Sequence, residues 1–465
     1  MELDLSIFKA YDIRGVVGNT LNAEVAYAVG RAMGALIRQK GQHEAVLGRD
    51  GRLSGPELSK AVAEGLRDSG IDVVDVGMVP TPMVYFATFF FGHGSCVQVT
   101  GSHNPPRYNG FKLMAAGQTL YGETIKGLYD WICTHKPKSS DGVVAQKGQY
   151  REFDIWPEYL KKIVDHIRLE RPVSLAIDCG NGVAGAYAEK LYQALGCTVK
   201  PIFCEVNGHF PNHHPDPADP KNLQDLIQIV KTSDAEFGIA FDGDGDRLGV
   251  VTKTGEIIYP DRQLILFAQD VLSRCPGEQI IFDVKCSRNV ERVIRQAGGY
   301  PLMWRTGHSL IKAKLRETGA PLAGEMSGHI FFKERWYGFD DGLYAGVRLL
   351  EILSRHHNVS SVLENLPNSL STPELQIKTR DGKNFEVVQN LLDQSATFFP
   401  GASKVISIDG VRAEYSDGFG LARASNTTSV IVLRFEADTP EALIRIQNEF
   451  KKAISSLLPA AMLPF

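Results

Sequence analysis

The sequence predicts an α/β fold with three related α/β units followed by a smaller C-terminal α+β unit. Strand-like runs that end in loops alternate with helical stretches through most of the chain, which is typical of α/β layers with mixed, largely parallel sheets. Three of these runs, 95–100, 236–241 and 321–324, each lead into a polar loop that contains glycine. Open α/β sheets bind their ligands at such strand exits, so the three loops indicate three related units that face one site.

Composition places the chain among ordinary globular proteins. Of its 465 residues 43% are hydrophobic and 22% are charged, and 50 lysines and arginines against 54 acids give a net charge of -4. This length predicts about three or four domains and therefore a multidomain enzyme. The chain contains no long run of like charges, which argues against nucleic-acid and membrane binding but is compatible with a small anionic substrate.

Polar and turn-forming segments divide the chain into four predicted domains. These segments are 135–148, 252–256 and 366–373. Clusters of glycine, proline and polar residues are typical of linkers and loops. They place the domains at 1–149, 150–253, 254–367 and 368–465.

The last predicted domain has its own pattern. Strand-like segments at 404–409 and 429–437 precede an amphipathic helix that begins at Pro440. The apolar residues at helical spacing are Leu443, Ile446, Phe450 and Ile454. This pattern predicts a small α+β unit closed by a helix.

The N-terminus lacks the basic and apolar regions of a signal peptide, which predicts a cytoplasmic protein. The most apolar stretch, 78–91, is interrupted by Pro80 and Pro82 and is shorter than the about 20 residues of a membrane span. The seven cysteines contain no C-x-x-C pair. We therefore predict neither a disulfide framework nor a zinc knuckle.

An acidic triplet follows the run 236–241. Asp242, Asp244 and Asp246 alternate with glycines, and an extended backbone turns their carboxylates to one side. Oxygen ligands suit a hard cation, and an EF-hand is excluded because Arg247 stands where that loop requires glycine. We therefore predict a compact Mg²⁺ site. The alternative is a turn with solvated carboxylates, which is common for one Asp-Gly pair and uncommon for three.

The segment 100–105 follows another strand and places a hydroxyl, Ser102, beside an imidazole, His103. Ser102 is a candidate nucleophile, although the segment does not match the G-x-S-x-G elbow and a simple turn is an equal alternative. Lys112 supplies a cation that could assist proton transfer or could lie at the surface.

Two further loops offer hydrogen-bonding side chains. Glu325, Ser327 and His329 present a carboxylate, a hydroxyl and an imidazole, which suit sugar hydroxyls, and His329 could also donate a proton. Residues 423–428 combine an arginine with short hydroxyl and amide side chains, which can surround a phosphate dianion. A lone loop histidine such as His329, however, is more often a plain hydrogen-bonding residue, and the segment 423–428 taken alone is more often a capping or turn segment.

Two patterns suggest other chemistry. Gly180, Gly182 and Gly185 follow a strand and precede Glu205 by about twenty residues, as in a dinucleotide fingerprint. Folds that bind no nucleotide also need such turns, so binding of NAD or FAD is a minor alternative. The three histidines in 209–214 could bind a metal, but the neighbouring prolines favour a rigid surface loop.

The motifs together resemble the α-D-phosphohexomutase superfamily. TGSHNP, DGDGDR, GEMSGH and RASNTT occur in this order after an N-terminal FKAYDIRG, and the resemblance runs from about residue 8 to about residue 437. Within the superfamily the chain resembles the bacterial phosphomannomutase/phosphoglucomutase branch. It has KAYDIRG instead of GTDGIRG, and Met326 instead of the glutamine usual in phosphoglucosamine mutases.

The resemblance implies four domains around a central cleft and a role for individual residues. It implies that Ser102 carries a phosphoryl group and that the Mg²⁺ ligands are this group on Ser102, Asp242, Asp244 and Asp246. The other catalytic residues expected are Arg14, His103, Lys112, Arg247 and His329. The substrate-binding residues expected are Tyr11, Lys285, His308, Glu325, Ser327, His329, Arg423, Ser425, Asn426 and Thr427. The glycine fingerprint and the histidine loop then become structural features of the second domain.

The activity implied is the reversible conversion of mannose 6-phosphate to mannose 1-phosphate, and of glucose 6-phosphate to glucose 1-phosphate. A hexose 1,6-bisphosphate forms, reorients and returns its other phosphate to Ser102. Mg²⁺ and the bisphosphate are the expected cofactors, and a monomer that binds phosphosugars, with no nucleic acid and no membrane, is the expected state. The alternatives are a phosphoglucosamine mutase, a dinucleotide-dependent oxidoreductase and an inactive sugar-phosphate binder.

Overall fold

The computed structural model describes residues 3–135, 146–380, 382–459 and 462–465. It divides into two compact units, which are described separately. The first comprises Met1–Pro260, Lys312–Leu322 and Ser327–Asn365, and the second comprises Asp261–Ile311, Ala323–Met326 and Leu366–Phe465. Most of the linker predicted at 135–148 lies outside the described residues.

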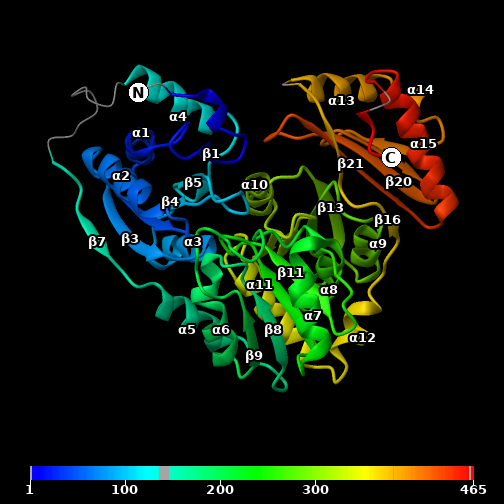
Figure 1. Ribbon diagram of the computed structural model, residues 1–465, viewed down its shortest axis with the longest axis horizontal. Coiled ribbons are helices and arrows are strands. Elements are labelled where there is room, and N and C mark those ends of the chain that lie inside the picture. The colour runs from blue at the N-terminus through cyan, green and yellow to red at the C-terminus, as the bar shows by residue number, and fades with distance from the viewer. Residues whose placement is uncertain (1–2, 136–145, 381, 460–461) are drawn as a thin grey trace. The chain divides into compact units, whose positions relative to one another are not determined.

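A seven-stranded mixed sheet forms the N-terminal part of the first unit (Figure 1). Its strands are β1 (Ile13–Val16), β2 (Glu44–Arg49), β3 (Asp72–Met78), β4 (Cys96–Val99), β5 (Tyr108–Ala115), β6 (Gln118–Thr119) and β7 (Tyr150–Glu152). Their order is β1-β5-β4-β2-β3-β7, with β6 paired to β5. β2 pairs in parallel with β3 and β4, whereas β5 is antiparallel to β1 and β4. Because β7 pairs with β3, this sheet extends past the domain boundary predicted at residue 149.

Helices cover this sheet and share its core. They are η1 (Leu5–Ile7), α1 (Ala23–Gln39), α2 (Gly55–Asp68), α3 (Thr81–Phe90) and α4 (Glu123–Thr134). Asn22 caps α1 by accepting a hydrogen bond from the Val25 N–H. Val29 of α1, Val62 of α2 and Leu47 of β2 are buried in one apolar cluster. Burial of these faces fixes the strand exits at which the candidate site lies.

A four-stranded sheet of order β11-β10-β8-β9 forms the next part of the first unit. Its elements are α5 (Trp156–His166), β8 (Ser174–Asp178), η2 (Val183–Ala186), α6 (Ala188–Ala194), β9 (Thr198–Ile202), η3 (Pro220–Leu223), α7 (Gln224–Thr232), β10 (Phe237–Phe241) and β11 (Leu248–Thr252). The unit also contains β15 (Ile330–Phe332), α11 (Gly342–Leu353) and α12 (Val359–Glu364). β8 is parallel to β9 and β10, and β11 is antiparallel to β10, so the prediction of mixed, largely parallel sheets is confirmed.

The second unit begins with α8 (Pro260–Arg274), β12 (Gln279–Asp283), α9 (Arg288–Gln296) and β13 (Tyr300–Trp304). β12 is parallel to β13 and also neighbours β14 (Leu322–Gly324). The first residues of α10 (His308–Thr318) belong to this unit, and its remaining residues belong to the first unit.

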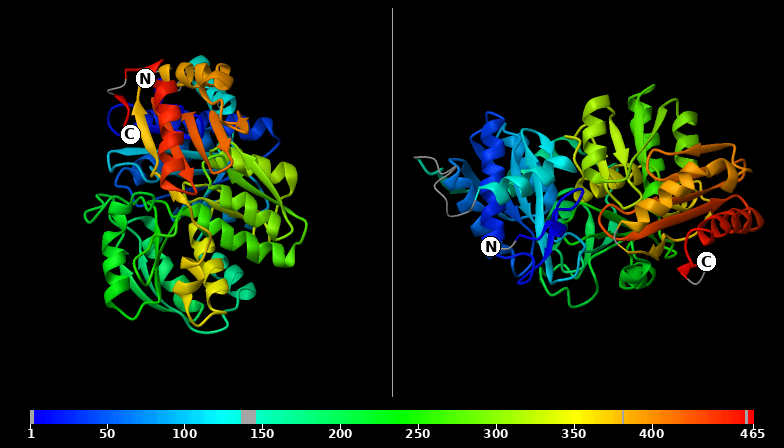
Figure 2. Two further views of the ribbon diagram at one scale, coloured as in Figure 1. Left: turned by 90° about the vertical axis from the view of Figure 1, so that its right-hand side faces the viewer. Right: turned by 90° about the horizontal axis from the view of Figure 1, so that it is seen from above.

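An antiparallel sheet completes the second unit. It contains β16 (Leu370–Ser371), β17 (Leu375–Lys378), β18 (Lys404–Ile406), β19 (Val411–Tyr415), β20 (Gly418–Ala424) and β21 (Val430–Ala437), with α13 (Lys383–Asp393), α14 (Ser395–Phe398) and α15 (Pro440–Ser455). α15 packs on β20 and β21 (Figure 2). Ile446, Phe450 and Ile454 of α15 are buried there, which confirms the helix predicted from Pro440.

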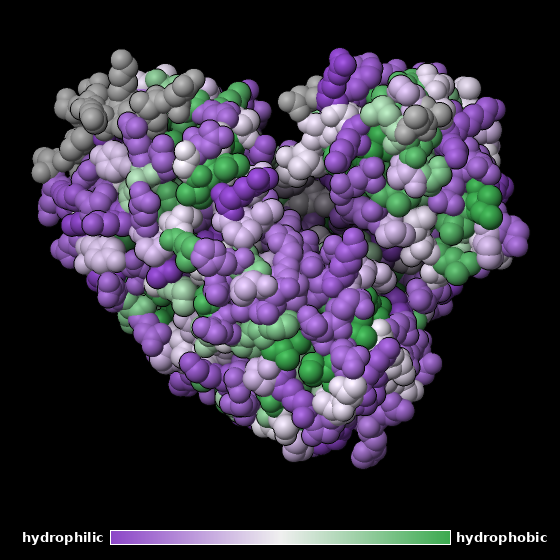
Figure 3. Space-filling model, in the orientation of Figure 1, coloured by the Kyte–Doolittle hydropathy of each residue, from purple (hydrophilic) through white to green (hydrophobic). Residues whose placement is uncertain are grey.

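The surface of the chain is mixed in polarity. Figure 3 shows hydrophilic side chains over most of the face in view, with hydrophobic ones among them, as is usual for folded proteins. No helix within the described residues is long and apolar enough to cross a membrane. The apolar stretch 78–91 contains the last residue of β3 and the whole of α3.

Candidate active site

The serine loop directly follows β4, an interior strand of the first sheet. Ser102 has a φ of 48°, a left-handed conformation that costs a residue with a side chain about 1–3 kcal/mol and that recurs at active sites. Its side chain is buried, and its backbone N–H donates a hydrogen bond of 2.8 Å to Thr100 Oγ1. The loop therefore holds one hydroxyl group in a defined place at a strand exit.

A buried ion pair fixes the backbone of this loop. The Arg52 guanidinium donates four hydrogen bonds of 2.6–2.8 Å to the carbonyl oxygens of Ser102, Asn104, Pro105 and Tyr108. Asp50 pairs with Arg52 at 3.2 Å and accepts hydrogen bonds from the Thr100 hydroxyl and the Gly101 N–H. Burial raises the pKa of Asp50 and lowers that of Arg52, and the attraction between the two charges opposes both shifts.

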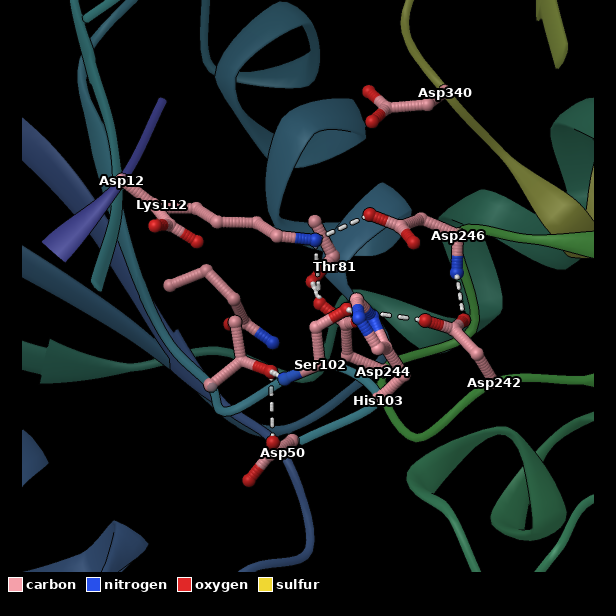
Figure 4. A network of polar contacts seen from close by, with 12 residues as sticks. Asp12, Asp50, Thr81, Ser102, His103, Lys112, Asp242, Asp244, Asp246 and Asp340 are labelled. Atoms are coloured by element: carbon pink, nitrogen blue, oxygen red, sulfur yellow. Dashed lines mark hydrogen bonds and ion pairs between the residues drawn. The ribbon is translucent and has the colours of Figure 1, made fainter. Parts of the chain in front are cut away.

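Three buried carboxylates follow β10 (Figure 4). Asp242, Asp244 and Asp246 have no exposed surface, and one oxygen of each lies within 4.8 Å of the others. The N–H groups of Asp246 and Arg247 donate to Asp242 Oδ1, which closes the loop. Ser102 Oγ donates to Asp242 Oδ2 at 3.1 Å. The first unit thus brings the predicted nucleophile to the predicted metal ligands.

The acidic triplet fits a hard divalent cation. Burial raises the pKa of Asp242 well above its usual value, and the charges of Asp246 and Asp244 raise it further. Asp244 Oδ2 accepts a hydrogen bond of 2.5 Å from Thr81 Oγ1, whereas its buried Oδ1 accepts none from the residues that the structure describes. Oxygen ligands, mutual repulsion and a buried acceptor without a donor all match what Mg²⁺ requires.

A second group of possible ligands overlaps the triplet. Asp246 and His329 lie close to Asp340, again with one ligand atom of each within 4.8 Å of the others. The Asp340 carboxylate, however, forms an ion pair of 2.7 Å with Lys312. Because this group includes a nitrogen ligand, whereas the triplet offers only carboxylate oxygens, it suits Mg²⁺ less well than the three aspartates do.

Lys112 is a buried counter-charge of the triplet. Its Nζ donates to Asp244 Oδ2 at 2.8 Å and to the Asp246 carboxylate. Burial disfavours the ammonium form, but the charges of Asp244 and Asp246 outweigh burial and hold the pKa of Lys112 above its ordinary value. Lys112 is therefore a fixed cation of the site and not a surface lysine.

Arg14 and His103 flank the serine loop. Arg14 Nη1 donates to Asn104 Oδ1 at 2.9 Å and to the Gly101 carbonyl oxygen. His103 Nδ1 lies 3.2 Å from Ser102 Oγ. Burial, and then the charges of Arg247 and Arg14, hold the pKa of His103 well below its usual value. The imidazole beside the serine is therefore neutral at neutral pH.

Arg247 and His329 meet beside the triplet. Arg247 Nε donates to His329 Nε2 at 3.3 Å, and this nitrogen also lies 3.4 Å from Asp246 Oδ1. His329 Nδ1 lies 3.0 Å from Ser327 Oγ. Tyr11 is half-buried just before β1 in the same unit. Arg14, His103, Lys112, Arg247 and His329 therefore gather near the serine and aspartate loops.

The second unit contains the other predicted substrate-binding residues. The buried Arg423 is in β20, and Ser425, Asn426 and Thr427 follow it in the loop before β21. Ser425 Oγ accepts from the N–H groups of Thr427 and Thr428 at 3.4 and 3.2 Å. This loop therefore gathers short polar side chains and backbone N–H groups beside one arginine.

Lys285 follows β12 and carries a charge that its neighbours stabilise. It pairs with Glu374 at 3.0 Å. Burial lowers the pKa of Lys285, but the charges of Glu374 and Asp283 outweigh burial and raise it, with Arg423 acting in the opposite direction. The two predicted cations of this unit are thus near each other.

Glu325 and His308 are also buried in the second unit. Glu325 Oε1 accepts a hydrogen bond of 2.5 Å from the Gly307 N–H, and His308 is the first residue of α10. The GEMSGH segment (324–329) and the RTGHS segment (305–309) therefore meet through Glu325 and the residue before His308.

Sequence reasoning missed the carboxylates and the arginine that support these loops, namely Asp50, Arg52, Asp283 and Asp409. Asp283 accepts a hydrogen bond from the Met326 N–H, and Asp409 accepts one from Arg423 Nε. For Asp50 and Arg52 a signal existed, because GRDGR at 48–52 ends β2 just as the other motifs end their strands. Asp283 and Asp409 lie outside the recognised motifs, and their roles depend on contacts with residues far along the chain.

The glycine fingerprint is a packing turn. A Cβ on Gly182 would lie 3.0 Å from Gly243 Cα, and the Val183 N–H donates to the Gly243 carbonyl oxygen. A Cβ on Gly185 would lie 2.1 Å from the Cys204 carbonyl oxygen. Protein backbone therefore fills the space beside these glycines, and they support the aspartate loop.

The histidine-rich segment 209–214 is anchored by hydrogen bonds. His213 Nε2 contacts Asp178 Oδ2 at 3.0 Å, and His213 Nδ1 contacts the His214 carbonyl oxygen at 2.9 Å. Among the residues that the structure describes, the groups able to hold a metal do not include these histidines.

These features define a class of multidomain α/β enzymes, in which a strained serine stands beside buried carboxylates and cations suited to phosphoryl transfer. The chain belongs to the phosphoglucomutase/phosphomannomutase family. It matches the family's alpha/beta/alpha domains I, II and III over residues 5–137, 157–255 and 259–370, and its C-terminal domain over 374–453. The predicted family and the predicted fold class are therefore confirmed.

Individual relatives agree with the family match. A phosphoglucomutase of Neisseria meningitidis is 59% identical over 97% of each chain, and a phosphomannomutase/phosphoglucomutase of Pseudomonas aeruginosa is 55% identical over 98% of each chain. A solved structure of a family protein from Burkholderia thailandensis is 57% identical, covers 100% of both chains and has a TM-score of 0.93.

Proposed function

We propose that this chain interconverts the 6-phosphates and 1-phosphates of glucose and mannose through a phosphoryl group carried by Ser102. The observation that carries the proposal is the distance of 3.1 Å between Ser102 Oγ and Asp242 Oδ2 within a buried acidic triplet. The names of the relatives, phosphoglucomutase and phosphomannomutase/phosphoglucomutase, favour these two sugars over glucosamine. A glucosamine mutase and an inactive binder are the alternatives.

The charges around Ser102 suit transfer of a phosphoryl group. Arg14, Arg247 and the fixed cation Lys112 stabilise charge on the transferred oxygens, and positioning of this kind supplies most of the catalysis in phosphoryl transfer. Asp242, Asp244 and Asp246 would hold Mg²⁺, which would supply Lewis acidity toward the same phosphate. The neutral His103 shares a hydrogen bond with Ser102 Oγ and so orients this oxygen.

One group is best suited to move the proton of the attacking sugar hydroxyl. Lys112 is held in its charged form by two carboxylates and cannot readily accept a proton. His329 has an imidazole in the same cluster, oriented by Ser327 and Arg247. We therefore assign proton transfer to His329 and charge stabilisation to Lys112.

The second unit supplies groups for the sugar and for the phosphate that does not react. Arg423, Ser425, Asn426 and Thr427 bind this phosphate, with Lys285 as a second cation. Glu325 and His308, together with Ser327 and Tyr11 of the first unit, bind sugar hydroxyls. Because one phosphate site accepts either end of the hexose, a hexose 1,6-bisphosphate can reorient and return its other phosphate to Ser102.

The remaining expectations belong to the same proposal. The four domains are those at 1–149, 150–253, 254–367 and 368–465, with β7 added to the first. The protein acts as a cytoplasmic monomer, its partners are phosphosugars, and a hexose 1,6-bisphosphate activates it.

The test combines intact mass with activity on glucose 1-phosphate and mannose 1-phosphate. The wild-type chain, treated with glucose 1,6-bisphosphate, gains one phosphoryl group and shows mutase activity on both sugars. Ser102→Ala shows neither property, whereas Ser174→Ala, at another serine of the same unit, shows both. A wild-type chain that gains no phosphoryl group, together with a fully active Ser102→Ala, would contradict the proposal. Preference for glucosamine 1-phosphate would support the alternative.

A further inference from the structure

Asp409 connects two segments of the second unit, the one that contains Arg423 and the one that contains Thr306 and His308. It lies in the turn between β18 and β19, and its side chain is only 9% exposed. Its Oδ2 accepts two hydrogen bonds, one of 3.1 Å from Arg423 Nε and one of 3.0 Å from the Thr306 N–H. One carboxylate oxygen thus joins the proposed phosphate loop to the RTGHS segment.

The turn that carries Asp409 is packed directly on Arg423. The next residue, Gly410, has a φ of 88°, and a Cβ there would lie 2.4 Å from the Ala422 carbonyl oxygen and 2.7 Å from Arg423 Cα. Only glycine allows this approach. The position of the Asp409 backbone relative to that of Arg423 is therefore fixed.

The backbone around Thr306, which donates the second hydrogen bond to Asp409, is also held in place by hydrogen bonds. Thr306 Oγ1 donates to Asp283 Oδ2 at 2.8 Å, and the Gly307 N–H donates to Glu325 at 2.5 Å. The backbone to which Asp409 binds is therefore the same turn that orients Glu325 and leads into His308.

We propose that Asp409 is a positioning residue for binding of the phosphate that does not react, an inference that rests on the proposed function. A carboxylate bound to Nε fixes the plane of a guanidinium, and the two Nη groups then point in one direction as a fork suited to phosphate. Asp409 sets this direction for Arg423 relative to the groups that bind the sugar.

The positioning role and a simple charge effect predict opposite results. Asp409 is an anion close to a site proposed to bind a dianion, so its charge by itself weakens phosphate binding. If charge dominated, Asp409→Asn would tighten binding and lower KM. If positioning dominates, the same change loosens Arg423 and raises KM.

Two variants and one matched control separate these effects. Asp409→Asn removes the charge at constant size, and Asp409→Glu keeps the charge but displaces the carboxylate. We expect each to raise the KM for glucose 1-phosphate about tenfold and to change kcat less than about twofold. The control is Asp417→Asn, in the turn between β19 and β20, where Arg445 Nη2 of α15 lies 2.6 Å from Asp417 Oδ1, and it leaves both constants unchanged. A KM that falls or stays constant in Asp409→Asn, or an unchanged KM in Asp409→Glu, would overturn the proposal.

Direct binding keeps this test separate from the proposed function. The dissociation constant of glucose 1-phosphate is measured by calorimetry on Ser102→Ala with and without Asp409→Asn, after circular dichroism shows that both are folded. Binding that weakens about tenfold supports the positioning role even if no turnover is found, and equal binding rejects it. Absence of mutase activity in the wild-type chain would instead reject the proposed function.

Discussion

Gly243 faces the backbone of Ser102 so closely that a Cβ at Gly243 would lie 2.3 Å from the Ser102 carbonyl oxygen. Gly243 stands between the first two aspartates of the triplet, and the Ser102 carbonyl is one of those held by Arg52. The serine loop and the aspartate loop therefore meet through backbone atoms, and the absence of a side chain at Gly243 sets the distance between the two loops.

Gly243→Ala should separate these loops and reduce kcat by about 100-fold or more, because displacement of reacting groups by about 1 Å can cost this much. Mutase assays and thermal unfolding measure the effect. The control is Gly127→Ala in α4, where a new Cβ meets nothing within 4 Å. It should keep full activity and, at a helical position, gain a little stability. Full activity in Gly243→Ala would show that the contact is not required.

Removal of divalent cations should abolish activity and lower the thermal unfolding midpoint. A bound cation relieves the repulsion among Asp242, Asp244 and Asp246, and a ligand that binds only the folded state stabilises it. After EDTA treatment, MgCl2 should raise the midpoint by a few degrees. In Asp244→Asn about tenfold more MgCl2 should be needed to raise the midpoint by the same amount. The control Asp219→Asn, at an exposed aspartate, should behave as wild type. A midpoint that does not respond to MgCl2 in the wild-type chain would argue against the site.

The sequence predicts the serine loop, the acidic triplet and the substrate loops because each is a local cluster of functional groups after a strand. It does not predict that Lys112 is buried, since a single lysine carries no sign of its surroundings. The burial of Lys112 follows from the antiparallel register of β4 and β5, which places Lys112 opposite Gln98. The role of Arg52 could not be predicted from the sequence for a related reason. Arg52 binds backbone carbonyl groups about 50 positions away, and every residue has such a group, so no sequence pattern marks the partners.

Asp341 should make the folded state less stable as pH rises from about 4 to 7. Burial raises the pKa of Asp341 to about 7, although hydrogen bonds from the Tyr344 N–H, Tyr159 and Trp336 oppose this shift. An unfolded chain releases this proton near pH 4, so the folded state binds more protons in this window. Its stabilisation by the bound proton is complete below pH 4 and is lost as pH approaches 7, at up to about 1.4 kcal/mol per pH unit.

The neutral variant Asp341→Asn should lack this contribution. At pH 5 its thermal unfolding midpoint should lie below that of the wild type, because the amide NH2 replaces one of the two oxygens that accept hydrogen bonds from Tyr344, Tyr159 and Trp336. The difference should shrink toward pH 8, because the wild type alone loses stability as Asp341 ionises. Unfolding of both chains at several pH values measures this trend. The exposed Asp393→Asn should follow the wild type throughout. A difference that is constant with pH would contradict the assignment.

Arg52→Lys should reduce kcat about 10- to 100-fold while the chain stays folded. A lysine keeps the charge opposite Asp50, but its three N–H groups on one nitrogen cannot reach the four carbonyls that the planar guanidinium holds, so the Ser102 backbone should relax from its strained conformation. The matched control is Arg348→Lys. Arg348 is equally buried and binds the Glu334 backbone and carboxylate, so its loss should lower the unfolding midpoint and leave kcat intact. In Arg52→Ala, added guanidinium should restore part of kcat by occupying the vacated space beside Asp50. If both lysine variants lose kcat in proportion to their loss of stability, or if guanidinium restores nothing, Arg52 acts only through the stability of the fold.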